Sequence, residues 1–260
     1  MNKLTCAILL FILPFGAIRV ECQEVQRREK IISTFSGRIP REWGVRVRGV
    51  KTRLKTDQKV LALTFDACGG MKGDGYDDRL IKYLEREKIP GTLFLSGRWI
   101  DANRNTFMEL AKNPLFEIEN HGLNHKPCSV KGQSIYGIKG TKSVGELIDE
   151  IEQNGINIQM LTGRKPTFYR SGTAYCDEIG VEVANVLGYE VVNFNVLGDA
   201  GVTYSKDQIK KALLSAPPSS IIIMHMNHPE RGARESLAQV VPELKKKGFR
   251  LVKLSGYDLK

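Results

Sequence analysis

The histidines of the chain fall in two short segments, each at the end of an apolar run. His121 and His125 form an H-x-x-x-H pair in the segment HGLNH, and His225 and His228 follow the run SIIIM. Two imidazoles at this spacing can bind one divalent ion, although the spacing alone is equally compatible with structural histidines. Zinc normally takes a third protein ligand and keeps one position for water, whose pKa it lowers to about 7. The pair is therefore a candidate site for hydrolytic chemistry.

Other chemically active side chains also follow apolar runs. Asp66 follows KVLALTF, Arg170 ends PTFYR, and Asp199 lies just past VVNFNV. The carboxyl ends of parallel strands lie at one rim of a barrel, and active sites are built on that rim. We therefore predict that these three residues share one site with the histidines. At the end of a buried strand, His225 is suited to protonate a leaving group.

The elements that would position these residues alternate along the chain. Apolar runs predict strands at 59–65, 91–96, 115–120, 166–170, 190–196, 220–226 and 249–255. Amphipathic segments predict helices at 143–152, 177–187, 205–214 and 234–247, and one further helix whose N-cap is Asp77 or Asp78.

This alternation predicts an α/β fold with a parallel sheet. The runs show little polar alternation, as expected for strands covered on both faces. No nucleotide-binding glycine fingerprint follows the first strand, so we expect a closed or nearly closed (β/α) barrel of about seven parallel strands. The long loop 121–142 is expected to act as a flap over the binding face.

The N-terminal 58 residues differ from the remainder in composition. Residues 1–22 predict a cleaved secretory signal peptide, with Lys3 before a short apolar stretch and small side chains near Cys22. A membrane anchor and a lipoprotein are the alternatives. Residues 23–58 predict an irregular basic arm, and residues 59–260 the folded domain. We expect a secreted protein, or one of the periplasm or cell envelope, with no stable membrane insertion after cleavage.

Charge and cysteine content narrow the class of partner. The formal net charge of +10 suggests an anionic surface or polymer as partner, such as a cell wall or polysaccharide. Nucleic acid is not expected, because the basic residues are spread out and the cluster at 46–55 lacks interleaved aromatic residues. Beyond residue 22 only Cys68, Cys128 and Cys176 remain, so at most one disulfide can form.

Taken in order, these segments resemble the polysaccharide deacetylases, the family that shares the NodB homology domain. The resemblance covers roughly residues 58–256. It is specific in three motifs and looser in two: TFDACG (64–69), HGLNH (121–125) and IIIMHM (221–226), then FYRSGTAY (168–175) and NVLGDAG (195–201). FYRSGTAY and NVLGDAG depart most from the motifs of the family, and FYRSGTAY lacks the proline of its motif.

The resemblance implies a metal-dependent hydrolase, usually a zinc enzyme, that removes N-acetyl groups from amino sugars on a distorted (β/α) barrel. It implies that Asp66 is the general base, oriented by an ion pair with Arg170, and that His121 and His125 are the metal ligands. It implies further that His225 is the acid for the departing amine and that Asp199 is the partner of this acid. The backbone N–H of Tyr175 would be a donor to the oxyanion.

One position departs from the family pattern at the metal. The residue after the base is a metal ligand in the family, and here it is Ala67, which ligates nothing. Asp66 itself, a carboxylate of the following loop (Asp74 or Asp77), or Cys68 could replace it. The interpretation favours Asp66 or Asp77, with the helix N-cap as the alternative role of Asp77. Low metal affinity is a fourth possibility.

The expected function is therefore deacetylation of N-acetylglucosamine or N-acetylmuramic acid units in an exported polysaccharide, with peptidoglycan as the preferred substrate. The alternative is a catalytically inactive carbohydrate-binding relative that lost its metal through Ala67. A hydrolase of small cyclic amides is a third hypothesis, disfavoured by the intact histidine pair. His228 is interpreted as a turn residue.

Overall fold

The structure is a computed structural model that describes residues 15–260, with side chains from residue 23 onward. Residues 1–14 of the predicted signal peptide lie outside the described residues. Within the described part of the chain, no helix combines the length and apolar character needed to cross a membrane.

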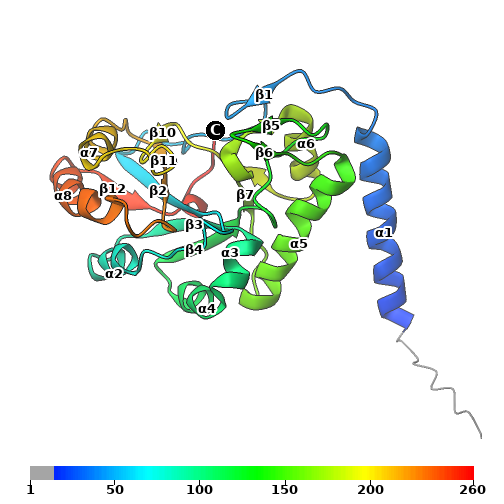
Figure 1. Cartoon of the computed structure of the whole chain (residues 1–260), viewed down its shortest axis with the longest axis horizontal. Coiled ribbons are helices and arrows are strands. Elements are labelled where there is room, and N and C mark those ends of the chain that lie inside the picture. The colour runs from blue at the N-terminus through cyan, green and yellow to red at the C-terminus, as the bar shows by residue number, and fades with distance from the viewer. Residues whose placement is uncertain (1–14) are drawn as a thin grey trace, which may run out of the picture.

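Eight parallel strands form the central sheet (Figure 1). Seven run in the order β10-β11-β2-β3-β4-β7-β9, and β12 pairs beside the first residues of β2. Their bounds are β2 (Val60–Ala67), β3 (Gly91–Leu95), β4 (Phe116–Asn120), β7 (Phe168–Tyr169), β9 (Glu190–Val191), β10 (Val196–Leu197), β11 (Ser220–His225) and β12 (Arg250–Val252). The sheet curls with β10 and β9 at its two edges, which confirms the predicted distorted (β/α) barrel.

Two short antiparallel pairs lie outside this sheet. One joins β1 (Trp43–Gly44) to β8 (Cys176–Asp177), and the other joins β5 (Ser134–Ile135) to β6 (Ile138–Lys139). Tyr136 and Gly137 connect β5 to β6 with φ of 54° and 77°. Positive φ at both central residues is typical of the tight turn that a two-residue hairpin requires.

Helices cover the outer face of the sheet. They are α1 (Phe15–Phe35), α2 (Asp78–Arg86), α3 (Gly97–Ala102), α4 (Arg104–Lys112), α5 (Val144–Thr162), α6 (Glu178–Val186), α7 (Lys206–Leu214) and α8 (Ala233–Lys246), with short 3-10 turns η1 (Gly172–Ala174) and η2 (Leu254–Gly256). Every predicted helix is present. The helices α3 and α4 were not predicted, and α5 continues ten residues beyond the predicted end at 152.

Side chains of the central strands alternate between two apolar layers. In β2, Leu61, Leu63 and Phe65 pack in the layer beneath the helices, whereas Val60 and Ala62 pack inside the barrel. Successive residues of a strand point to opposite faces, so Thr64 and Asp66 also point inward. The interior is thus apolar at the amino ends of the strands and becomes polar at their carboxyl ends.

Several predicted strands are shorter than their apolar runs. The run 190–196 was predicted as one strand and forms two, β9 and β10. Between them, the Asn193 amide donates to the carbonyls of Val45 and Ala174, and Asn195 exchanges hydrogen bonds with Ser220 and the Ile221 N–H. The side chains of both asparagines thus bind neighbouring segments at the point where the run divides into two strands.

The prediction of an irregular N-terminal arm is wrong for residues 23–35, which belong to α1. This helix lies along one flank of the molecule against α5 and α6 (Figure 1). Ile31 and Phe35, one turn apart, are buried in the same apolar cluster as α5 and α6. Further along, β1 pairs with β8 and Lys51 pairs with Val192, so the arm packs as part of the barrel.

Candidate active site

One cavity lies at the carboxyl ends of the central strands. Its volume is about 620 Å³. The polar residues that line it include Asp66, Cys68, His121, His125 and His225. These residues come from β2, β4 and β11 or the loops that follow them, and Arg170 and Asp199 are bound to two of them, whereas His228 lies outside the lining.

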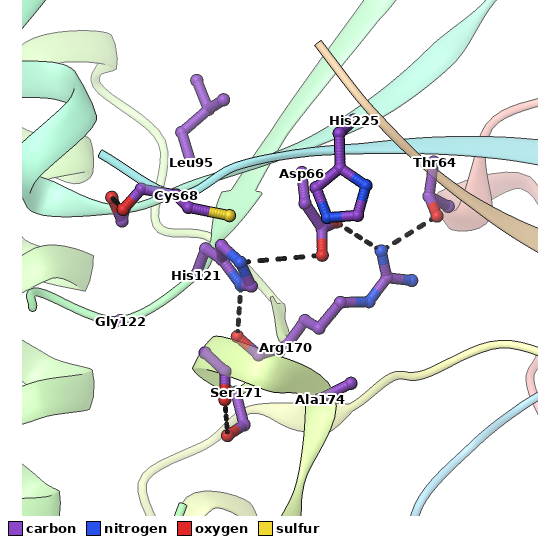
Figure 2. A network of polar contacts seen from close by, with 12 residues as sticks. Thr64, Asp66, Cys68, Leu95, His121, Gly122, Arg170, Ser171, Ala174 and His225 are labelled. Carbon is purple, nitrogen blue, oxygen red and sulfur yellow. Dashed lines mark hydrogen bonds and ion pairs between the residues drawn. The ribbon is translucent and has the colours of Figure 1, made fainter. Parts of the chain in front are cut away.

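Asp66 and Arg170 form a buried ion pair across the barrel. Arg170 Nη1 donates to Asp66 Oδ1 at 2.6 Å and to Thr64 Oγ1 at 2.9 Å (Figure 2). The remaining guanidinium donors bind the carbonyls of Val192 and Asn193, and the group lies 4.1 Å from the centroid of the Phe94 ring. Burial lowers the pKa of Arg170, and the Asp66 charge opposes that shift. The pair fixes the Asp66 carboxylate with its second oxygen toward the cavity.

The His121 ring is held in one tautomer. Its Nδ1 lies 2.8 Å from the Arg170 carbonyl, which can only accept, so Nδ1 carries the proton. The opposite nitrogen, Nε2, is buried without a hydrogen-bond partner, 3.6 Å from Asp66 Oδ2. A buried imidazole nitrogen with a free lone pair is the expected state of a metal ligand whose other nitrogen is fixed by a backbone carbonyl.

The loop between the two histidines is fixed by Glu150 of α5. Its carboxylate accepts the backbone N–H groups of Asn124 and Lys126, on either side of His125, at 2.9 and 3.0 Å. The carbonyl of Glu150 accepts the Leu123 N–H. With this support the His121 and His125 ring centroids lie 4.8 Å apart. Burial raises the pKa of Glu150, while the hydrogen bonds from the loop oppose the shift.

His225 is adjacent to Asp66 and pairs with Asp199. Strands β11 and β2 pair in parallel, and His225 lies opposite Asp66 in their register. Asp199 accepts the His225 backbone N–H at 2.6 Å and lies 2.9 Å from Nδ1. Burial by itself lowers the pKa of the imidazole, but the Asp199 carboxylate raises it, and the net result is a pKa well above the usual value. The protonated form of His225 is therefore favoured, and Nε2 is the ring nitrogen that Asp199 does not engage.

Cys68 completes a compact group with the histidine pair. The Cys68 sulfur and one nitrogen each of His121 and His125 all lie within 4.8 Å of one another. Figure 2 shows this thiol directed toward the His121 ring. Burial tends to raise the pKa of the thiol, but the neighbouring imidazoles, His125 foremost, lower it well below the usual value.

The other acids considered as metal ligands serve the backbone. Asp77 is the N-cap of α2, where its side chain accepts the Leu80 N–H at 3.0 Å, and this confirms the alternative interpretation. Asp74 accepts the Gly70 N–H within its own loop. His228 contacts Glu230 at 3.1 Å in a turn outside the cavity lining.

Tyr175 lines the cavity with Tyr136 and Phe194, and its ring also contacts Trp43, which lies outside the lining. Its ring is 5.7 Å from Trp43 of β1 and 5.8 Å from Tyr136 of the β5–β6 hairpin, centroid to centroid. Tyr175 directly follows the 3-10 turn η1 and lines the cavity, and the role of its backbone N–H toward an oxyanion stays a prediction. The flap predicted at 121–142 thus contributes Tyr136 and Ile138 to the cavity.

Several cavity residues hold unusual backbone conformations. His125, Thr173, Ala174 and Ala200 have φ between 49° and 70°, in the left-handed region that non-glycine residues rarely adopt. Gly172 packs against this region, since a Cβ on it would lie 2.3 Å from the His125 carbonyl. Strain of this kind persists where surrounding structure imposes it, and it clusters at functional sites.

Two supporting residues were missed from the sequence. Glu150 was counted only as part of an amphipathic helix, and Gly172 as part of a loosely matching motif. The signal that could have identified Glu150 is an acid on the face of α5 that is otherwise mostly apolar and buried. Nothing local to Gly172 indicates its contact with His125, which lies 47 residues earlier.

Comparison with known proteins agrees with this geometry. The sequence profile of the family described as polysaccharide deacetylase matches residues 53–192, more than half of the chain. A peptidoglycan-N-acetylglucosamine deacetylase of Bacillus cereus is 24% identical over 217 residues, covering 79% of this chain and 91% of the relative.

Solved structures share the fold. The family 4 carbohydrate esterase PdaA of Bacillus subtilis has a TM-score of 0.67 at 19% identity, over 90% of this chain and 88% of that chain. A family 4 pseudoenzyme from Bacillus anthracis has a TM-score of 0.66 at 20% identity, over 79% of this chain and 67% of that chain. On the profile match and the shared fold, this chain belongs to the polysaccharide deacetylase family.

Proposed function

We propose that the chain is an exported metal-dependent hydrolase that removes N-acetyl groups from the amino sugars of a polysaccharide, with peptidoglycan as the substrate. The observation that carries the proposal is the convergence of Asp66, the His121–His125 pair and His225 on one cavity. A site that only binds sugar has no need for a base and an acid on opposite sides of a histidine pair.

The residues divide the proton transfers of amide hydrolysis between them. Asp66, held by Arg170, takes a proton from the attacking water. His225, kept protonated by Asp199, gives a proton to the departing amine. The Tyr175 N–H is assigned to the negative charge that develops on the acetyl oxygen, where one such donor contributes about 3 kcal/mol.

The histidine pair fits a metal, zinc being the expected ion. His121 and His125 would hold it, and the buried Nε2 of His121 without a partner is the observation that supports the fit. A bound zinc polarises the scissile carbonyl and makes hydroxide available near neutral pH. The negative charges near His121, which raise its pKa against the effect of burial, would also attract a cation.

The cavity walls support a sugar polymer as substrate. Tyr136, Tyr175 and Phe194 line the cavity, and aromatic rings suit the apolar faces of sugar rings. The choice of peptidoglycan is supported by the basic charge of the chain and by the named activity of the Bacillus cereus relative. Export is supported by the composition of residues 1–22.

The test measures acetate release from N-acetylglucosamine oligomers and from peptidoglycan, together with bound metal per chain. We expect about one divalent ion per chain and a loss of about 10²–10⁴-fold in turnover in Asp66→Asn. The matched control is Asp101→Asn, at an exposed acid of α3 away from the cavity. It should release acetate at the wild-type rate.

Two outcomes would overturn the proposal. Absence of acetate release from protein that retains tight binding to the oligomers would favour the inactive carbohydrate-binding alternative. Undiminished release by Asp66→Asn would place the base elsewhere.

A further inference from the structure

The metal group of this chain contains a sulfur atom. Among the described residues, the ligand atoms of three or more His, Cys, Asp or Glu side chains lie near one another at one place only. The side chains there are Cys68, His121 and His125. Their ligand atoms lie within 4.8 Å of one another. A tetrahedral zinc with bonds of about 2.1 Å to nitrogen and 2.3 Å to sulfur would separate its ligands by roughly 3.6 Å. Closing of the three side chains around the ion by about 1 Å covers the difference.

Strand geometry directs Cys68 to the cavity. Ala67 is the last residue of β2 and is buried in the layer beneath the helices, with Leu63 and Phe65. Because side chains alternate along a strand, the residues on either side of Ala67 point to the other face. Asp66 and Cys68 both line the cavity, and Ala67 does not.

The competing carboxylates lie outside the compact group of ligand atoms. Asp77 caps α2 and Asp74 closes its own loop. Asp66 is bound through Oδ1 to Arg170, and its charge is balanced by that guanidinium. Among the described residues, the Cys68 sulfur is the one further ligand atom that lies near both histidines. The Nε2 of His121, a residue that is 1% exposed, has no hydrogen-bond partner.

We propose that Cys68 is the third protein ligand of the metal, in the role for which position 67 offers no donor. The assignment rests on the proposed metal-dependent hydrolysis. The ligand is the thiolate, so binding of the metal displaces the thiol proton into solvent when the thiol is protonated. The protein donor set becomes one sulfur and two imidazole nitrogens, and the remaining position is open to water.

This donor set leaves Asp66 free as a base and changes the metal preference. Thiolate is a soft ligand that favours zinc, whereas carboxylate and water suit magnesium and manganese. A Cys-His-His site should therefore discriminate strongly against manganese and magnesium. Replacing the sulfur by a carboxylate at the same position should weaken that discrimination.

The decisive experiment is cobalt(II) substitution of the purified full chain, followed by absorption spectroscopy. The wild type should show a near-ultraviolet sulfur-to-cobalt charge-transfer band, and Cys68→Ser should lack it. The matched control Cys128→Ser removes a buried thiol that is not part of the metal group and should keep the band. Cobalt bound without this band, or an unchanged band in Cys68→Ser, would overturn the assignment while leaving metal-dependent hydrolysis intact.

Zinc affinity, measured by competition with a chelating dye, gives an independent readout. Loss of an outer partner of a metal ligand typically costs 10–100-fold in affinity, and we expect Cys68→Ser to lose at least about 100-fold. Cys68→Asp should recover part of the zinc affinity and bind manganese more tightly than the wild type. Wild-type zinc affinity in Cys68→Ser would overturn the assignment. No metal binding by wild-type protein would instead refute the proposed function itself.

Discussion

Disruption of the Arg170–Asp66 ion pair should cost much more stability than disruption of a surface pair. Both side chains are at most 3% exposed, and the contact between them is 2.6 Å. In Arg170→Met the Asp66 charge stays buried without its partner, which typically costs about 3–5 kcal/mol. Methionine is chosen because its unbranched apolar side chain can occupy the space beside Phe94.

The double variant Asp66→Asn/Arg170→Met tests the reasoning. It contains no buried unpaired charge, so the remaining deficit comes from the lost hydrogen bonds to Thr64, Val192 and Asn193, at about 0.5–1.5 kcal/mol each. Both variants lose these hydrogen bonds, and only Arg170→Met keeps an unpaired charge, so we expect the double variant to be about 3–5 kcal/mol more stable than Arg170→Met.

The assay is urea unfolding followed by circular dichroism, with a chelator present so that bound metal does not contribute to stability. Arg38→Met is the matched control, because Arg38 pairs with Glu182 at 2.6 Å on the surface, with both side chains more than a third exposed. Such a pair contributes at most about 1 kcal/mol. The reasoning is refuted if the Asp66→Asn and Arg170→Met costs add to within about 0.5 kcal/mol in the double variant.

Two further predictions concern residues that act through the histidines. Asp199→Asn removes the charge that raises the pKa of His225, so this pKa should fall. The alkaline limb of the pH profile of kcat/KM should then move to lower pH. An unmoved limb would mean that another group is the acid. Glu150→Ala leaves the N–H groups on either side of His125 without an acceptor, and zinc binding measured by calorimetry should weaken about 10–100-fold. Glu150→Gln should be less affected, because its carbonyl oxygen still accepts a hydrogen bond. Equal zinc affinity in the wild type and both variants would contradict a positioning role for Glu150.

The sequence predicted the barrel because its strong signals are local. Apolar runs such as 59–65 and 220–226 are buried over almost their whole length, and the caps at Asp77 and Ser143 mark helix starts. The end of the run 190–196 was not predictable in the same way. Its strand is interrupted by Asn193, whose amide is bound by residues 148 and 19 positions away.

The same distinction applies to the site. The reactive residues could be found because each ends an apolar run, and parallel topology then brings those ends together. The side chains that support the site come from distant segments: Glu150 of α5 holds the histidine loop, and Tyr136 and Trp43 pack on Tyr175. Their side chains match ordinary surface or helix residues in type, so only the three-dimensional packing identifies them.

The alternation of β2 explains why TFDACG is more than a family motif with one ligand missing. Shifting by one residue along a strand reverses the direction of the side chain. An acid at position 67 of this backbone would enter the apolar layer that holds Ala67, where an unpaired carboxylate is costly. Position 68 has the same orientation as Asp66, so the base and the proposed sulfur ligand reach the cavity from alternate residues of one strand. The glycines at 69 and 70, both at positive φ, then turn the chain away immediately after the sulfur.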